Sequence, residues 1–147
     1  MTNLEQLGKR WTELFDKKDL HGLMTLYAEN CINAQPHLPQ PIKGKKATEE
    51  DLNSFFKAFP DGKFVATDMV TSSDTLAMEW TYTGTQTGAL AGPAGTIPPS
   101  GKHVTIKGAE FIKVDAQGLI VDERGYFDLV SFLTQLGVMP APQASRA

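Results

Sequence analysis

The first part of the chain places hydrophobic residues at helical spacing. Apolar side chains recur every three or four residues, which predicts helices over 4–17, 19–28 and 48–59. Between the last two helices, residues 31–35 alternate between apolar and polar and predict a short strand, which ends at a cluster of prolines. The sequence Pro60-Asp61-Gly62 is typical of a sharp turn and ends the third helix.

From residue 63 onward the hydrophobic period changes to two. This alternation predicts four long strands, over 63–71, 75–87, 102–114 and 119–128. Strands that follow one another through short turns form an antiparallel sheet, and helices followed by such strands indicate an α+β fold. The long loop 88–101 contains four Gly and three Pro. Long loops within compact domains often act as lids, so we expect this one to cover the mouth of a pocket.

Composition indicates one globular domain. The chain has 147 residues, of which 41% are hydrophobic and 21% charged, as in ordinary soluble proteins. We expect a single domain over 1–137 and a flexible tail over 138–147. The net charge of −3 and the scattered basic residues argue against nucleic acid as a partner. No apolar run reaches about 18 residues and no secretion signal is present, so we expect no membrane contact and a cytoplasmic location.

The cysteine and histidine residues give no sign of a metal site. Cys31 is the only cysteine, which agrees with a reducing compartment, and its place in an alternating segment predicts a buried core position. His21, His37 and His103 lack the spacing of metal ligands. We therefore expect neither a metal nor an organic cofactor.

The strand over 119–128 carries the strongest candidate for chemistry. Its alternation places Arg124, Tyr126 and Asp128 on one face, directly before an apolar helix. Neighbours of this kind can tune the proton affinity of an acid, as a general acid or base requires, so Asp128 is our candidate catalytic residue. Two alternatives stay open: Asp128 only caps the helix that begins at Leu129, or it pairs with Arg124, which would lower its pKa.

The segment from Gly118 to Gly137 resembles the C-terminal signature of the SnoaL-like polyketide cyclases, a branch of the nuclear transport factor 2-like superfamily. The resemblance implies three N-terminal helices packed on a strongly curved antiparallel sheet that forms a cone-shaped pocket. It also implies an acid/base role for Asp128. Further matches lie before this segment and occur in the same order as in the family: Tyr27-Ala-Glu-Asn30, Gly44-Lys-Lys-Ala47, Phe59-Pro-Asp61, Trp80, Gly84-Thr-Gln-Thr-Gly88 and Gly101-Lys-His-Val104.

One position departs from the family pattern. The family usually has Thr-His-Thr-Gly where this chain has Thr85-Gln86-Thr87-Gly88, and the resemblance implies that the histidine helps to stabilise an enolate. The amide of Gln86 can donate a hydrogen bond but cannot titrate, so we take Gln86 as a candidate donor to a developing oxyanion. Further residues expected to line the pocket and bind substrate are Trp11, Asn33, Gln35, Trp80, Tyr82, Arg124 and Tyr126.

Three classes of function agree with these patterns. The first is a cofactor-free enzyme of the cyclase or isomerase type, acting on a small apolar molecule that contains a carbonyl group. The second is a non-catalytic module that binds a small ligand or dimerises. The third is an epoxide hydrolase, which in this superfamily needs two acids flanking an arginine. Asp122 and Asp128 lie about 20 Å apart at about 3.3 Å per residue, too far for both to contact one water molecule, which disfavours the epoxide hydrolase class. The threonine-rich face of the strand over 75–87 predicts a homodimer packed through the sheet.

Overall fold

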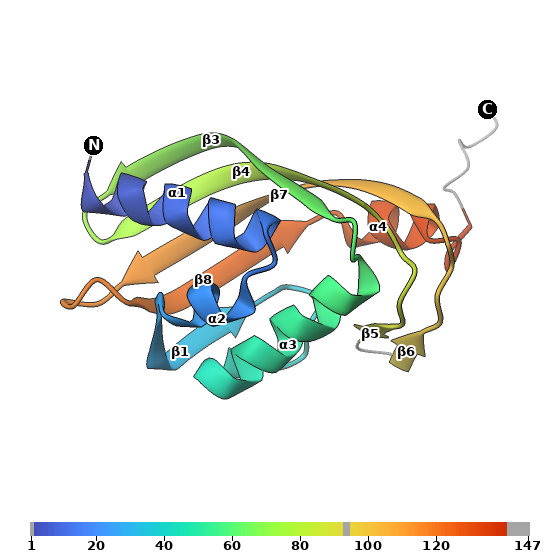
Figure 1. Ribbon diagram of the computed structural model, residues 1–147, viewed down its shortest axis with the longest axis horizontal. Coiled ribbons are helices and arrows are strands. Elements are labelled where there is room, and N and C mark those ends of the chain that lie inside the picture. Colours follow the sequence, from blue (N-terminus) through green and yellow to red (C-terminus); the bar gives the residue numbers. More distant parts are fainter. Residues whose placement is uncertain (1, 93–94, 141–147) are drawn as a thin grey trace, which may run out of the picture.

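The computed structural model of the chain describes residues 2–92 and 95–140. Within these residues, four helices accompany a six-stranded sheet and a separate two-stranded sheet (Figure 1). The α+β class predicted from the sequence is confirmed. The predicted flexible tail, 138–147, lies mostly outside the described residues. None of the described helices is long and apolar enough to cross a membrane.

The first helix, α1 (Asn3–Asp16), begins with a reciprocal cap. The Thr2 hydroxyl accepts a hydrogen bond from the Glu5 backbone N–H, and the Glu5 carboxylate accepts one from the Thr2 N–H. These bonds satisfy two backbone groups that a helix start leaves without partners. The helix buries one stripe of residues against the sheet: Gly8, Trp11, Leu14 and Phe15.

The helix predicted over 19–28 is much shorter in the structure. Helix α2 (Leu20–Met24) ends early, and strand β1 (Tyr27–Ala34) follows almost at once. Tyr27 belongs to the sheet because it pairs with Ile120 of the last strand. This contact between distant parts of the chain overrides the helical spacing of the local sequence.

The third helix, α3 (Lys45–Ala58), begins three residues before the predicted start. Gly44 precedes it with a φ of +90°, a conformation that glycine adopts without strain. Thr48, at the predicted start, lies inside the helix, where its hydroxyl donates to the Gly44 carbonyl. The short strand β2 (Ile42–Lys43) leads into this helix and pairs with β1.

The six-stranded sheet is mixed, which corrects the expectation of an antiparallel sheet. Its order is β2-β1-β8-β7-β4-β3. Strands β1 and β8 run parallel, whereas the other neighbouring strands of this sheet run antiparallel. The long strands lie close to their predicted positions: β3 (Lys63–Ser72), β4 (Thr75–Thr85), β7 (His103–Val114) and β8 (Ile120–Phe127).

Strand β8 contains a bulge near its start that decides which side chains face inward. Lys113 of β7 pairs with Asp122, but its neighbour Val114 pairs with Ile120, so Val121 is an extra residue on β8. An extra residue shifts every later side chain of the strand to the opposite face. As a result, Ile120 and Glu123 are both buried, although they are three positions apart.

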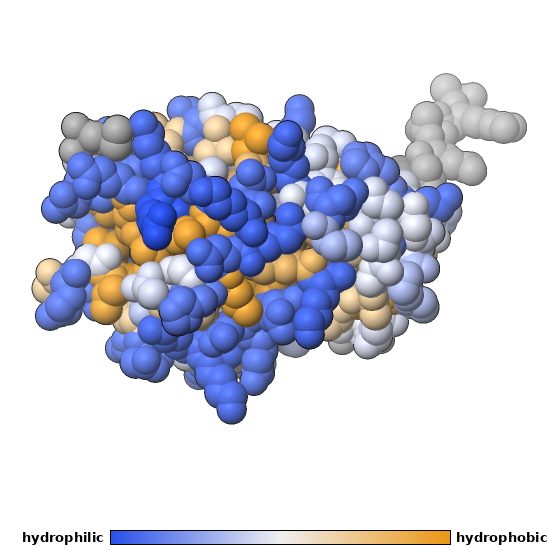
Figure 2. Space-filling model, viewed as in Figure 1, coloured by the Kyte–Doolittle hydropathy of each residue, from blue (hydrophilic) through white to orange (hydrophobic). Residues whose placement is uncertain are grey.

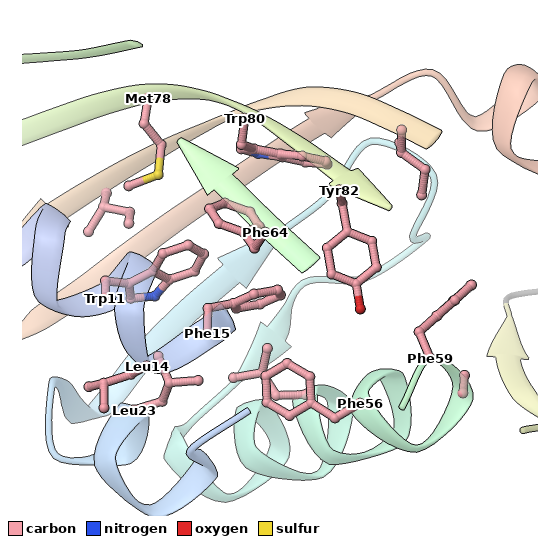
Figure 3. Close-up of a cluster of buried hydrophobic side chains, with 14 of the residues drawn as sticks. Trp11, Leu14, Phe15, Leu23, Phe56, Phe59, Phe64, Met78, Trp80 and Tyr82 are labelled. Carbon is pink, nitrogen blue, oxygen red and sulfur yellow. The ribbon is translucent and has the colours of Figure 1, made fainter. Parts of the chain in front are cut away.

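Helices α1 and α3 lie over the same face of the sheet (Figure 1). Figure 3 shows aromatic side chains of α1 and α3 pointing toward those of β3 and β4 in the space between the helices and the sheet. In the view of Figure 2, hydrophobic residues are visible between α1 and α3, with hydrophilic residues on both sides. The side chains between the helices and the sheet are therefore largely apolar.

The long loop after β4 contains structure that the sequence did not predict. Strands β5 (Leu90–Gly92) and β6 (Gly95–Ile97) pair as a small antiparallel sheet. The Ala58 carbonyl at the end of α3 accepts hydrogen bonds from two backbone N–H groups at the start of the loop. After β8, helix α4 (Leu129–Gln135) packs against β7.

Candidate active site

A cavity of about 190 Å³ lies between the helices and the inner face of the sheet. Aromatic rings of α1, β3 and β4 form much of its wall, and the loop that carries β5 and β6 contributes Leu90 and Ile97. The polar or ionisable groups among the described lining residues are fewer, and they come from β1 and the segment after it, α3, β4, β7 and β8: Asn33, Gln35, His37, Asp51, Ser54, Trp80, Tyr82, Glu110 and Glu123.

Two glycines on the inner face of the sheet leave room for large side chains of the cavity. A Cβ atom on Gly108 would lie 2.4 Å from the Trp80 ring, so the indole can lie over this position only because no side chain is there. A Cβ atom on Gly125 would lie 2.8 Å from a Glu110 carboxyl oxygen. The absence of these side chains therefore positions Trp80 and Glu110.

Glu123 is the most buried carboxyl group of the cavity, with 4% of its surface exposed. Its carboxylate accepts hydrogen bonds from the Tyr27 hydroxyl at 2.5 Å and from the Asn33 amide at 3.4 Å. The Tyr27 oxygen in turn accepts a bond of 3.0 Å from the Trp11 indole N–H. A chain of donors from α1 and β1 thus fixes the orientation of one carboxylate.

Burial and hydrogen bonds act in opposite directions on Glu123. Loss of contact with water is the largest effect and raises its pKa, the hydrogen bond from Tyr27 lowers it, and the nearby Asp51 and Asp122 carboxylates raise it. The result is a pKa of about 7. Burial and the Glu123 carboxylate raise the pKa of Tyr27, so the phenol keeps its proton and remains a donor. Glu123 is therefore suited to take up a proton near neutral pH.

Glu110 of β7 brings a second carboxyl group into the same cavity. Burial and the charge of Glu123 raise its pKa well above the ordinary value. None of the described residues donates a hydrogen bond to this carboxyl group, in contrast to Glu123. The two acids thus differ in environment, and such a difference separates their proton affinities.

Three buried polar atoms of the cavity wall have no hydrogen-bond partner among the described residues. They are the Trp80 indole N–H, the Tyr82 hydroxyl and the Asn33 carbonyl oxygen. A buried polar group without a partner is costly, which makes these three atoms exceptions within the described structure. The Trp80 N–H is a fixed donor in an apolar wall, as stabilisation of a negatively charged oxygen requires.

Five of the predicted binding residues line this cavity. Trp11 comes from the buried stripe of α1, Asn33 lies on β1 with Gln35 just after it, and Trp80 and Tyr82 come from the inner face of β4. The structure therefore brings together residues that are far apart in the sequence.

The predicted acid Asp128 lies outside the cavity. It is exposed and precedes α4, and its carboxylate accepts a hydrogen bond of 3.0 Å from the Ser131 backbone N–H. This is the helix cap that the sequence left open as an alternative. Asp128 does not face the cavity, because the bulge at Val121 turns its face of the strand outward.

Arg124 and Tyr126 lie on the outer face of the sheet for the same reason. Arg124 is exposed, forms an ion pair of 3.4 Å with Asp122, and lies over the Phe111 ring. Tyr126 is 44% exposed and contacts the edge of the same ring. Neither lines the cavity, and the ion pair of Arg124 is with Asp122 rather than with Asp128.

Gln86 is fully buried but serves the loop rather than the cavity. Its amide nitrogen donates to the carbonyl oxygens of Gly88, Ile97 and Pro98, and its oxygen accepts from the Ser100 N–H. These bonds hold the two ends of the loop together, so the amide is not available as the predicted oxyanion donor.

Replacing Gln86 with Ala is expected to lower the free energy of unfolding by about 1–3 kcal/mol, because buried backbone groups of the loop lose their partners. Urea denaturation measures this. The matched control is Thr87→Ala at the exposed neighbouring position, with an expected change within about 0.5 kcal/mol. Equal stability of the two variants would contradict the conclusion that Gln86 holds the two ends of the loop together.

Sequence reasoning missed Glu110, Glu123 and Tyr27. An acidic residue within an apolar strand could have indicated a buried acid at both glutamates. Regular alternation without the bulge, however, assigns Glu123 to the outer face of the sheet. Tyr27 was assigned to a helix. The prediction that Cys31 is buried is confirmed. The residues that the structure describes contain no cluster of metal-ligating side chains.

Comparison with known proteins gives one family. The model of the SnoaL-like polyketide cyclase family matches residues 5–136. No match was found among curated proteins.

Solved structures share the fold at low sequence identity. A Jannaschia sp. protein assigned to the SnoaL-like polyketide cyclases has a TM-score of 0.80 and 19% identity, and the match covers 94% of this chain and 93% of that one. TsrD from Streptomyces laurentii has a TM-score of 0.78 and 19% identity, with 93% and 96% covered. An NTF2-like protein of unknown function from Burkholderia pseudomallei has a TM-score of 0.76 and 15% identity, with 92% and 98% covered.

Proposed function

The chain belongs to the SnoaL-like polyketide cyclase family, and from this premise we propose that it is a cofactor-free acid–base enzyme of the cyclase or isomerase type. Its substrate is a small apolar molecule with a carbonyl group. The observation that carries the proposal is Glu123, a carboxylate fixed by Tyr27 and Asn33 inside a largely aromatic cavity.

Glu123 acts as the base in this proposal, in place of Asp128. A proton on a carbon next to a carbonyl group is acidic enough for a carboxylate with a raised pKa to remove. The hydrogen bonds from Tyr27 and Asn33 hold the carboxylate in one orientation, so little reorganisation is needed at the moment of transfer. The unpartnered Trp80 N–H supports the negative charge that develops on the carbonyl oxygen.

Solvent deuterium exchange tests the proposal. The probe is 2-tetralone, a small apolar ketone, and proton NMR in heavy water follows the loss of signal next to its carbonyl group. The wild-type protein is expected to accelerate this exchange over buffer alone. Binding of 2-tetralone without any acceleration would contradict the proposal and favour the second candidate function.

That second candidate is a non-catalytic ligand-binding module. The observation in its favour is Gln86, which replaces the histidine of the family pattern and uses its amide in the loop. The epoxide hydrolase interpretation has less support. Although Glu110 and Glu123 supply two acids, no arginine is among the described cavity residues, and Arg124 lies on the outer face.

A homodimer through the outer face of the sheet is part of the same proposal. Exposed Val70 and Phe111 lie on either side of Ala77, and these three residues form an apolar row across β3, β4 and β7. Sedimentation at micromolar concentration is expected to give a dimer, and Phe111→Asp is expected to give a monomer by placing a charge in the contact. A wild-type monomer would contradict this arrangement.

A further inference from the structure

We propose that Glu110 is the general acid of the same cavity: its neutral carboxyl group protonates the carbonyl oxygen while Glu123 removes the proton from the adjacent carbon. The substrate is accordingly an uncharged ketone or ester. This inference rests on the proposed function, because it assigns the second half of the same reaction.

The register of the sheet places the two acids side by side. Glu110 of β7 pairs directly with Gly125 of β8, and Glu123 lies two residues away on the same inner face. Diagonal neighbours of this kind on adjacent strands have Cα atoms roughly 7–8 Å apart, which long side chains can bridge. Both residues line the cavity, and the missing side chain of Gly125 leaves the Glu110 carboxyl group its space.

Hydrogen bonding decides which acid carries the charge. Tyr27 and Asn33 both donate to Glu123, whereas none of the described residues donates to Glu110. The negative charge therefore rests on Glu123, and this charge holds the proton on Glu110. The raised pKa of Glu110, caused by burial and by Glu123, agrees with this order.

Trp80 supplies a second hydrogen-bond donor to the proposed position of the carbonyl oxygen. Trp80 lies on the inner face and pairs with Gly108, which precedes Glu110 by two residues on β7. Only 8% of the surface of Trp80 is exposed. Its indole N–H has no partner among the described residues and needs an acceptor. A carbonyl oxygen between Trp80 and Glu110 would receive two hydrogen bonds.

The step conserves protons and charge within the cavity. The bond between hydrogen and carbon breaks, and the proton moves to the Glu123 carboxylate. The electron pair left on carbon forms a carbon–carbon double bond, and the carbonyl π electrons move to oxygen, which takes the proton of Glu110. An enol results, with Glu123 neutral and Glu110 ionised. The cavity thus holds one negative charge before and after, so no new charge is created in an apolar space.

The same charge argues for an uncharged substrate. The described lining residues include three acids, Asp51, Glu110 and Glu123, but no lysine or arginine. His37 does not replace them, because burial lowers its pKa. A carboxylate or phosphate group on the ligand would add a second negative charge with no positive partner.

The pH dependence of 2-tetralone exchange tests Glu110. The wild-type profile is expected to be bell-shaped, because Glu123 must be ionised and Glu110 protonated. Glu110→Ala is expected to lose about 10²–10³-fold in rate, as on removal of a donor to an oxyanion. Glu110→Gln is expected to lose less, because its amide still donates, and to lose the alkaline limb of the profile. The matched control is Glu79→Gln on the exposed face of β4, which is expected to leave the profile unchanged.

The outcomes separate this inference from the proposed function. If Glu110→Gln keeps both the rate and the alkaline limb, Glu110 is not the acid, whereas Glu123 can still be the base. If Glu123→Gln exchanges as fast as the wild type, the proposed function itself fails.

A second measurement needs no substrate. Carbon NMR of ¹³C-labelled glutamate side chains is expected to show that Glu123 ionises before Glu110 and that the pKa of Glu110 falls in Glu123→Gln. Ionisation of Glu110 first would overturn the inference.

Discussion

Replacing Glu123 with Gln is expected to slow the exchange of 2-tetralone by about 10²–10⁴-fold, the range that general acid–base catalysis contributes. Glutamine has nearly the shape of glutamate and can still accept from Tyr27, but its amide cannot take up the proton. Binding of the ketone is expected to persist because the aromatic wall of the cavity is unchanged. Proton NMR measures the rate, and tryptophan fluorescence measures the binding.

Asp128 supplies the matched control for this variant. Asp128→Asn is expected to leave exchange and stability nearly unchanged, since Asn caps a helix about as well as Asp. Asp128→Ala is expected to cost about 1 kcal/mol of stability through loss of the cap, again without an effect on exchange. Loss of exchange in Asp128→Asn, with Glu123→Gln active, would restore the assignment made from the sequence.

The second large effect concerns the stability of the fold as the pH rises. Glu123 has an ordinary pKa of 4.5 when exposed and about 7 in the folded protein. Between these two values the folded state binds more protons than the unfolded state, so the free energy of unfolding decreases as the pH rises. At about 1.4 kcal/mol per pH unit, the loss across this window is about 3 kcal/mol. The contribution is fully present below pH 4.5.

Urea denaturation of the wild type and of Glu123→Gln between pH 4.5 and 8 measures this loss. The variant lacks the titrating group, so its free energy of unfolding is expected to fall less than that of the wild type as the pH rises. The difference between the two proteins therefore shifts in favour of the variant. Comparing the two proteins cancels the contributions of the titrating groups that do not interact with Glu123. Parallel curves for the two proteins would contradict the raised pKa of Glu123.

Much of the fold follows from the period of the hydrophobic residues. The stripe of α1 and the alternation of β4 are local patterns, and they correctly predicted that Trp11, Trp80 and Tyr82 face the interior. The start of β1 was not predictable in this way, because Tyr27 joins the sheet through pairing with a strand about 90 residues later.

The candidate site shows a second limit of sequence reasoning. Alternation correctly placed Arg124, Tyr126 and Asp128 on one face, but that face is the outer one. The bulge at Val121 arises from how β8 pairs with β7, and the spacing of apolar residues within β8 contains no sign of it. Which of two alternating sets of residues faces a cavity is thus a property of the sheet rather than of the strand.

Both tryptophans of the chain, Trp11 and Trp80, line the cavity. The indole fluorescence of the unlabelled protein therefore originates entirely from the walls of the candidate site. Through Tyr27, the Trp11 indole is also hydrogen-bonded to the carboxylate whose protonation matters most. The molecule thus contains its own optical reporter, one chromophore beside the base and one beside the position expected for the carbonyl oxygen.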